Sequence, residues 1–250
     1  MRVLSLLLLL LALAPRVWGA VVFDASGVGN TGANLQTTLS FFVTVGNNTN
    51  RALVVGVCTA NGSADTATAT YNGDAMTQVA TAISSGVLAK TYLFRLLNPT
   101  IGVAEVVVTF STARRAGGGG VSLHSVHQVT PLDGTQTAAN ASDTSTLSVN
   151  VATEANDMVV DVGCKRNSAN ALVMGAQTNR VERYNTATTS TVTGGNVRVG
   201  GSTRTGAGSL TMNWSDGAAQ SNAMSVIGTN VNDVGTPAPG RSAGFLLLGR

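Results

Sequence analysis

The sequence ALVVGVC at residues 52–58 is nearly repeated as MVVDVGC at residues 158–164. Both stretches are rich in valine and other apolar residues, a composition typical of a buried strand. Each stretch ends in a cysteine, and the chain of 250 residues contains 2 cysteines. The repetition indicates a duplicated β unit in which Cys58 and Cys164 occupy equivalent positions.

The similarity extends on both sides of these strands. TTLSFFVTV from Thr37 aligns with STLSVNVAT from Ser145, and AEVVVTFS from Ala104 aligns with GSLTMNWS from Gly208. The second alignment places Phe110 opposite Trp214. We therefore expect two half-units, about 36–128 and 144–231, joined by a segment that contains Pro131 and the turn dipeptide Asp133-Gly134.

The residue pattern in the rest of the chain is also typical of a β protein. Short runs of Val, Thr, Phe, Leu and Tyr alternate with Gly, Asn, Asp and Ser, and no run of ten or more residues has helical apolar spacing. These runs predict strands at 20–24, 37–45, 52–59, 66–71, 76–83, 88–96, 103–111, 119–126, 145–152, 158–165, 179–184, 190–199, 207–214 and 223–231. We expect an all-β, antiparallel sandwich of jelly-roll type with about 12–14 strands, built from the two half-units. Two tandem immunoglobulin-like sandwiches are the alternative.

The N-terminus has the layout of a secretory signal peptide. Arg2 precedes an apolar run that ends in Gly19 and Ala20, and this run is shorter than the ~20 residues of a membrane span. We expect residues 1–19 to be removed, residues 20–232 to form the sandwich and residues 233–250 to be a flexible tail. The mature chain is then secreted, extracellular or at the cell surface, without a membrane span.

The charge is low and scattered. Charged residues make up 11% of the chain, and its formal charge of +3 falls to +1 once Arg2 and Arg16 are removed. No basic cluster is larger than Arg114-Arg115, whereas nucleic-acid binding needs a concentrated basic face. We therefore expect no nucleic-acid partner.

Several of these segments together resemble a known group of proteins. LSFFVTVGNNTNRALVVGV, YNGDAMTQV, LNPTIGVAEVVVTFS and VSLHSVHQVTPLDG are similar to a poorly characterised family of secreted bacterial β-sandwich domains of surface and extracellular proteins. Members commonly read Gly-Val-Asp where this chain has Ser125-Val126-His127. The resemblance covers about residues 20–231 and implies a fold and a location, but it carries over no catalytic residue.

The two cysteines leave two states open. In a secreted protein a pair of cysteines is more often bonded than free, and equivalent residues meet only near an axis that relates the two halves. However, Cys58 lies on the strand face opposite Leu53 and Val55, whereas Cys164 shares the face of Val160 and Val162. Comparison of these faces suggests that a disulfide needs a bulge in one strand, so both a bond and two free thiols remain open.

Catalytic signatures are weak. GVGNTG at 27–32 fits the dinucleotide pattern G-x-G-x-x-G, but a strand pattern follows it where a helix is required. His124 and His127 have neither the spacing nor the glutamate of a zinc-protease helix, and no G-x-S-x-G elbow is present. We expect no enzymatic activity.

Three carboxylates lie in or beside predicted strands: Asp161, Glu105 and Glu182. A pair of facing carboxylates is what a glycosidase needs, so these are the polar candidates for a site. Asp161 interrupts an apolar strand on the face opposite Val160 and Val162, and we expect it to point to solvent.

Glycan binding and calcium binding are further options. Sugar-binding modules present exposed aromatic platforms; Trp214 is expected in the core because it aligns with Phe110, which leaves Tyr71, Tyr92 and Tyr184. Loop oxygens near Asp24, Asn30 and Asn34, or near Asn72 and Asp74, would suit a calcium ion, but no calcium-loop pattern supports a cofactor.

The sequence thus predicts a secreted or cell-surface, non-enzymatic module with a structural, adhesive or filament-forming role. Its partner would be a second copy, through pairing of the N-terminal strand Ala20–Asp24 with a neighbouring sheet edge, or surface glycans. A carbohydrate-binding or carbohydrate-cleaving jelly roll is the alternative.

Overall fold

The computed structural model describes residues 19–60, 65–84, 89–140, 146–166, 172–189, 195–216 and 223–235. Within these ranges the chain forms antiparallel strands and no helix. The strands of the first half are β1 (Val22–Asn30), β2 (Gln36–Val45), β3 (Ala52–Ala60), β4 (Ala67–Tyr71), β5 (Asp74–Ala75), β6 (Thr77–Ile83), β7 (Ala89–Leu97), β8 (Gly102–Arg114) and β9 (Ala116–His124). Those of the second half are β10 (Leu132–Ala139), β11 (Thr146–Thr153), β12 (Met158–Arg166), β13 (Leu172–Met174), β14 (Arg180–Ala187), β15 (Val197–Thr205), β16 (Gly208–Asp216) and β17 (Met224–Val231).

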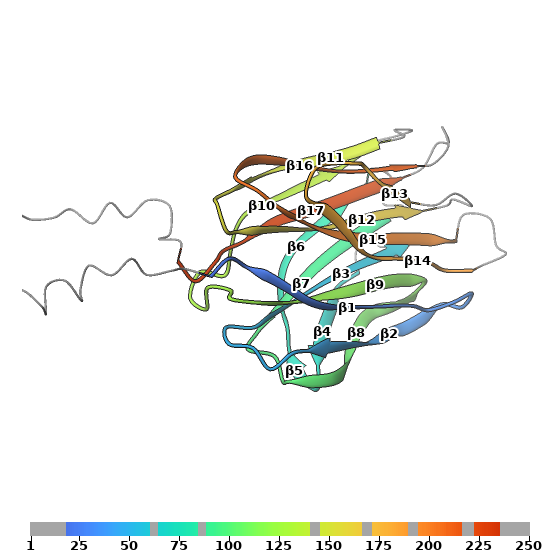
Figure 1. Ribbon diagram of the computed structural model, residues 1–250. Coiled ribbons are helices and arrows are strands. Elements are labelled where there is room, and N and C mark those ends of the chain that lie inside the picture. The colour runs from blue at the N-terminus through green and yellow to red at the C-terminus, as the bar shows by residue number, and fades with distance from the viewer. Residues whose placement is uncertain are drawn as a thin grey trace, which may run out of the picture.

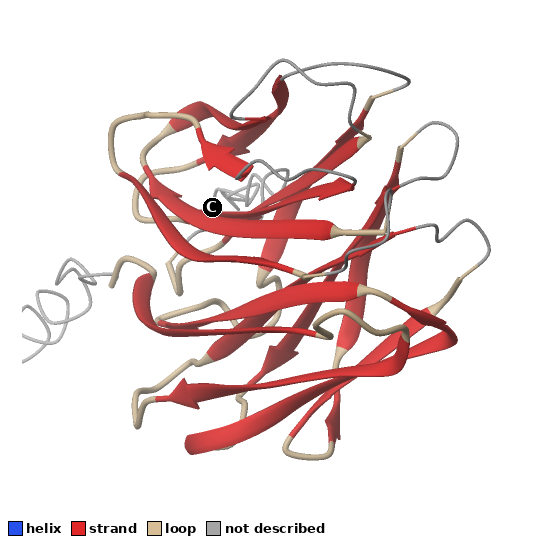
Figure 2. Ribbon diagram, turned by 90° about the vertical axis from the view of Figure 1, so that its right-hand side faces the viewer, coloured by secondary structure: helices blue, strands red, loops and turns tan. Residues whose placement is uncertain are grey.

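These strands form four sheets stacked as layers (Figure 1). The first half supplies a first outer sheet, β2-β8-β4-β5, and a first inner sheet, β1-β9-β3-β7-β6. The second half supplies a second inner sheet, β10-β17-β12-β15-β14, and a second outer sheet, β11-β16-β13. Separate apolar clusters fill the interior of each half and the space between the two inner sheets. Figure 2 shows the layers from the side.

The two inner sheets are related by a pseudo-two-fold axis. Their strand orders are equivalent, with β3 at the centre of one sheet and β12 at the centre of the other. In the stack β3 faces β12, β9 faces β15, β7 faces β17, β1 faces β14 and β6 faces β10. By strand order β9 is equivalent to β17, and β7 is equivalent to β15, so the contact of β9 with β15 repeats the contact of β17 with β7. Among these facing pairs, β3 and β12 are the two strands that are equivalent to each other. The axis passes through this central pair.

The all-β, antiparallel sandwich class is confirmed, and each half-unit contributes a pair of sheets of its own. This arrangement of sheets does not confirm the finer expectation of a jelly-roll strand order. The predicted signal peptide lies outside the described residues except for Gly19, and residues 236–250 of the predicted tail lie outside them as well.

The repeat begins earlier than expected. The segment with Asp133-Gly134 forms strand β10, which pairs with β17, just as β1 pairs with β9 in the first half. The glycine-rich segment after Asp24 is likewise part of β1 and not a loop. Strand β10 was missed and β1 was predicted only over residues 20–24, because the glycine and threonine content of these segments lacks the apolar alternation of the others.

The ladder register also corrects one alignment. Leu39 pairs with Val108 in the first half, and its counterpart Leu147 pairs with Trp214 in the second. The structural counterpart of Trp214 is therefore Val108 and not Phe110. The prediction that Trp214 lies in the core is nevertheless confirmed, because its side chain is fully buried.

Glycines in the central strands allow the layers to approach closely. A Cβ built on Gly119 of β9 would lie 2.4 Å from the ring of Tyr184, and one built on Gly201 would lie 2.1 Å from that ring. Tyr184 thus fills a slot between the inner sheets that only glycine leaves open. This packing accounts for the glycines at 119 and 201.

Candidate functional site

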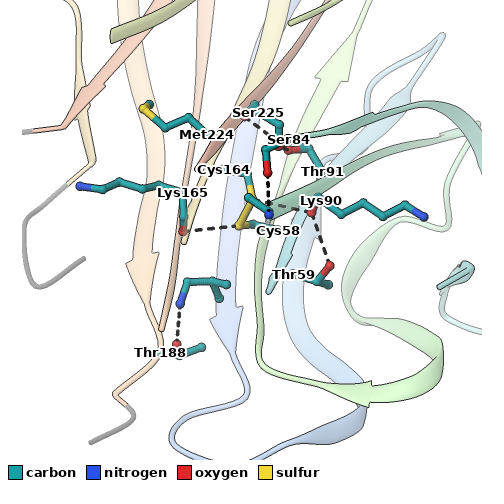
Figure 3. Close-up of a disulfide and its surroundings, with 12 residues drawn as sticks. Cys58, Thr59, Ser84, Lys90, Thr91, Cys164, Lys165, Thr188, Met224 and Ser225 are labelled. Atoms are coloured by element: carbon teal, nitrogen blue, oxygen red, sulfur yellow. Dashed lines mark hydrogen bonds between the residues drawn. A yellow bond between two sulfur atoms is a disulfide. The ribbon is translucent and has the colours of Figure 1, made fainter. Parts of the chain in front are cut away.

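The two cysteines are bonded to each other at the pseudo-two-fold axis. Cys58 on β3 and Cys164 on β12 form a disulfide with a Cα–Cα distance of 5.1 Å (Figure 3). Both residues are fully buried in the apolar cluster between the inner sheets. Beside them, Thr91 Oγ1 of β7 lies 2.5 Å from Ser225 Oγ of β17, a hydrogen bond that also joins the two halves.

No bulge was needed for this bond. β3 pairs with β7 and β9 without a register shift, and so does β12 with β15 and β17. Val54 and Val160 lie with the cysteines in the cluster between the halves, whereas Leu53 and Val55 face the first outer sheet. The expectation of a bulge was wrong because both faces of β3 are apolar, and the sequence alone did not distinguish the face that meets the second half.

Asp161 lies at the centre of a buried polar cluster and does not point to solvent. Its Oδ2 accepts hydrogen bonds from Arg180 Nη2 at 2.8 Å and from Trp214 Nε1 at 2.7 Å. Its Oδ1 accepts from the backbone N–H and the hydroxyl of Ser202, at 2.9 and 2.5 Å. Asp161 does face away from Val160 and Val162, but the second outer sheet covers that face.

The guanidinium of Arg180, like the carboxylate of Asp161, has several hydrogen-bond partners in the interior. Its Nε donates to Ser202 Oγ at 2.9 Å, and its Nη1 donates to the backbone oxygen of Asn213 at 2.7 Å. The guanidinium lies 5.2 Å from the centre of the Trp214 ring. Both side chains of the Asp161–Arg180 ion pair are fully buried.

Burial dominates the electrostatics of this cluster. Loss of water raises the pKa of Asp161, while the charge of Arg180 and the hydrogen bonds from Ser202 and Trp214 act in the opposite direction. Burial likewise lowers the pKa of Arg180, against the attraction of Asp161. A carboxylate with this many internal partners and no access to water stabilises the sheet pair and is unsuited to proton exchange with a substrate.

The other two predicted carboxylates lie apart from Asp161. Glu182 on β14 occupies the same cross-strand row, separated from Asp161 by Ser202 of β15, but its side chain is exposed. Glu105 lies on the solvent face of β8 in the other half. The structure therefore does not bring the three candidates together around an open cleft.

A second polar cluster lies at the end of the first half. Asp65 forms an ion pair with Arg114, whose Nη2 donates to Asp65 Oδ1 at 2.8 Å. The hydrogen bond to Arg114 lowers the pKa of Asp65. Lys90 Nζ donates to the backbone oxygen of Asp65 at 2.5 Å, and burial lowers the pKa of this lysine. The sequence offered no signal for this cluster because its members are far apart along the chain.

The aromatic residues do not form the expected sugar platform. Tyr71, Tyr92 and Tyr184 are buried. Among the described residues, the exposed aromatic is Phe42 on the solvent face of β2, with 63% of its surface accessible. Phe42 is paired across the strands with Glu105, and Val103 lies nearby on β8 with 68% of its surface accessible.

The remaining motifs have structural roles. Gly27 lies within β1 and packs against the backbone of Phe42. The next element after the GVGNTG segment is the strand β2, and not the helix that a dinucleotide site requires. His127 Nδ1 accepts a hydrogen bond from the backbone of Thr130 at 2.9 Å. Asp24 Oδ2 accepts from Gly46 N at 2.6 Å. Within the described ranges, no three His, Cys, Asp or Glu residues are grouped to hold a metal ion.

Two open hollows lie at the surface. One of about 400 Å³ is at the end of the second half, and one of about 420 Å³ lies between β6, β7 and the segment that joins the halves. The first is lined by Asp133, Gly134, Ala152, Thr153, Glu154, Gly208 and Asn230. The second is lined by Thr77, Gln78, Val79, Arg95, Val129, Thr130, Pro131, Leu132 and Thr135.

A search for membrane-spanning helices in the described part of the chain found none of sufficient length and apolarity. Comparisons of the chain with protein-family models, with curated proteins and with solved structures gave no match.

Proposed function

We propose that the protein is a secreted or cell-surface module without enzymatic activity, with a structural, adhesive or filament-forming role. The observation that carries this proposal is the buried disulfide between Cys58 and Cys164. Disulfides persist in oxidising compartments outside the cytosol, which agrees with the signal-peptide pattern. The bond also ties the central strands of the two halves together, so that neither half separates from the other without unfolding.

The polar clusters support the same role. The carboxylate of Asp161, one of the three site candidates from the sequence, is bound by Arg180, Ser202 and Trp214 in the interior. Asp65 is similarly engaged by Arg114. The ionic groups of Asp161 and Asp65 thus hold sheets together.

The test is the native state of the mature chain from Ala20, purified with its disulfide intact. We expect electron microscopy and sedimentation to show assemblies, or binding assays on cell-wall material to show adhesion. Reducing-sugar release from a polysaccharide panel is the control for activity. Turnover of any glycan, abolished by a substitution of one carboxylate, would overturn the proposal.

Glycan binding remains the second candidate because of Phe42. An exposed aromatic ring on the solvent face of β2, next to a carboxylate and an apolar side chain, offers a surface for stacking on a sugar ring. A glycan array probed with the wild-type chain and with Phe42→Ala tests this candidate. Binding that is lost in Phe42→Ala but kept in Val181→Ala, a matched exposed apolar residue on β14, supports it; the absence of binding by the wild type refutes it.

A further inference from the structure

One of the two surface hollows lies on the seam between the halves. Its walls are β6 and the end of β7 from the first half, and β10 with the segment that precedes it. β6 and β10 are edge strands of the two inner sheets and face each other in the stack (Figure 1). The volume of about 420 Å³ lies within the range of small-molecule pockets, roughly 300–1,000 Å³. We call this cavity the seam hollow.

Arg95 brings a positive charge to the seam hollow. It lies on β7, directly between Val54 of β3 and Thr77 of β6. Residues paired in this way share a face of the sheet, and Val54 packs in the cluster between the halves. The side chain of Arg95 therefore points toward the second half. None of the described residues that line the hollow is acidic, so this charge is not balanced there.

The guanidinium of Arg95 also differs from the other guanidinium groups. Within the described ranges, each of the other arginines has a hydrogen bond or another electrostatic contact in the chain, as Arg51, Arg114 and Arg204 illustrate. In the same ranges Arg95 has no such partner. A guanidinium carries five N–H donors and no acceptor, and this one is half-buried. It is therefore suited to bind an anion from outside the chain.

Neutral polar side chains surround this charge. They come from both walls of the seam hollow: Thr77, Gln78, Thr130 and Thr135. Two of the hydroxyls are held in place from behind. Thr130 Oγ1 lies 3.0 Å from His127 Nδ1, and Thr135 Oγ1 lies 2.7 Å from Thr229 Oγ1. Hydroxyl and amide groups both donate and accept hydrogen bonds, so these walls suit a ligand that carries several hydroxyl groups.

The rim of the seam hollow is apolar. Val129 has 85% of its surface accessible, the highest fraction among the large apolar side chains of the described residues. Pro131 lines the same wall. Apolar walls with a few convergent polar groups are typical of small-molecule sites. A sugar ring has C–H groups on its faces and hydroxyls at its edge, and this combination matches the rim and the walls.

We propose that the seam hollow binds an acidic sugar whose carboxylate pairs with the guanidinium of Arg95. The planar guanidinium fork donates two parallel hydrogen bonds to a carboxylate. The threonine hydroxyls and the amide of Gln78 bind the hydroxyl groups of the sugar. This inference rests on the adhesive role proposed above and names its ligand class and site.

An acidic peptide is the other anionic occupant to compare. An extended peptide would bind by adding a strand to the free edge of β6. However, the ladder of β6 has a register shift between Gln78 and Ala80, at the hollow itself. A bulge of this kind protects an edge against strand addition. The seam hollow is therefore better suited to a compact sugar than to an extended chain.

The experiment is titration calorimetry of the mature chain from Ala20 with short oligomers of galacturonic acid and of glucuronic acid. Their methyl esters keep the shape of the sugar but lose the charge, and we expect the free acids to bind and the esters to bind much more weakly. Arg95→Gln should weaken binding of the acids about 10–100-fold, because a charge-assisted hydrogen-bonded pair is lost. Arg95→Lys keeps the charge without the fork and should restore only part of the affinity.

The matched control is Arg115→Gln, which removes the same charge at the other end of the first inner sheet. Arg95 pairs with Val54 near the start of β3, whereas Arg115 lies beyond its end. This control should bind like the wild type. Thr77→Val on the exposed edge strand removes one hydroxyl and should weaken binding about 2–10-fold. It tests the site independently of any effect of Arg95→Gln on folding, which urea unfolding of each variant measures.

The possible outcomes separate this site from the proposed role. Equal binding by the wild type and Arg95→Gln, or binding that is lost in Phe42→Ala instead, would overturn the seam hollow as the site. Stronger binding of sulfated sugars or acidic peptides would overturn the choice of ligand. A wild type that binds none of the acids but adheres to cell-wall material or assembles would overturn this inference and leave the role standing. A wild type that does none of these would overturn both.

Discussion

Asp161 accepts the indole N–H of Trp214 at 2.7 Å in the interior of the second half. In the first half, the register places Val55 and Phe94 where the second half has Asp161 and Ser202. The same fold is therefore stabilised by an apolar contact in one copy and by an ionic network in the other. Duplicated sequences can diverge in this way because a buried polar group is tolerated when all its hydrogen bonds are satisfied.

Replacement of Asp161 by Asn should strongly destabilise the protein. The substitution keeps the shape but leaves the guanidinium of Arg180 buried without a counter-charge, which costs about 3–5 kcal/mol. Urea unfolding of the mature chain measures this loss. Glu182→Gln on the same cross-strand row is the control, and its exposed side chain should change stability by less than about 0.5 kcal/mol. Equal effects of the two variants would contradict the role assigned to the ion pair.

Removal of both members of the ion pair should cost less than removal of one. Asp161→Val with Arg180→Met gives the buried site an apolar character like that of the first half, so no unpaired charge remains. A double-mutant cycle of unfolding free energies measures the coupling. Additive losses from the two single changes would show that the pair does not act as a unit.

The disulfide should contribute about 2–5 kcal/mol to stability. The double variant Cys58→Ala, Cys164→Ala should unfold at a correspondingly lower temperature, because the unfolded chain gains the freedom of a loop with a sequence separation of 106 residues. Thermal unfolding with and without reductant measures the effect. Under native conditions reductant should leave the wild type bonded, since both cysteines are 0% exposed; rapid reduction without unfolding would contradict this burial.

Adding a methyl group to a glycine that contacts the Trp214 ring should destabilise the protein. A Cβ on Gly200 would lie 2.5 Å from the Trp214 ring, and one on Gly163 would lie 2.6 Å from it. Gly200→Ala should therefore cost about 1–3 kcal/mol through overpacking. In the background Trp214→Val, which restores the residue type of Val108, the cost should be much smaller. An unchanged cost in that background would place the strain elsewhere.

Acid should weaken the end of the first half through Asp65. The hydrogen bond from Arg114 lowers the pKa of Asp65 in the folded state below its unfolded value of about 3.9. The stabilisation is therefore present above that unfolded value and is lost as the pH falls through the lower folded value. The difference in unfolding free energy between the wild type and Asp65→Asn should shrink as the pH falls below ~4. Glu105→Gln on the solvent face of β8 serves as the comparison, and a constant difference for Asp65→Asn would rule out this linkage.

The sequence alone identified the class of the fold and its duplication. Alternating apolar residues such as Leu39, Phe41 and Val43 specify a strand with one buried face, and this information is local. The two cysteine-ending strands marked equivalent positions in the two halves. Trp214 was assigned to the core through its alignment, although its counterpart proved to be Val108.

Only the tertiary structure decided what the polar residues do. Asp161 was expected at the surface because it lies on the strand face opposite Val160 and Val162. The second outer sheet covers that face, and Arg180, Ser202 and Trp214 reach the carboxylate from β14, β15 and β16. Such long-range neighbours leave no periodic signal in the chain. For the same reason, the sequence of the central strands does not reveal which of their two apolar faces meets the other half. Whether Cys58 and Cys164 are bonded was therefore decided only by how the sheets stack.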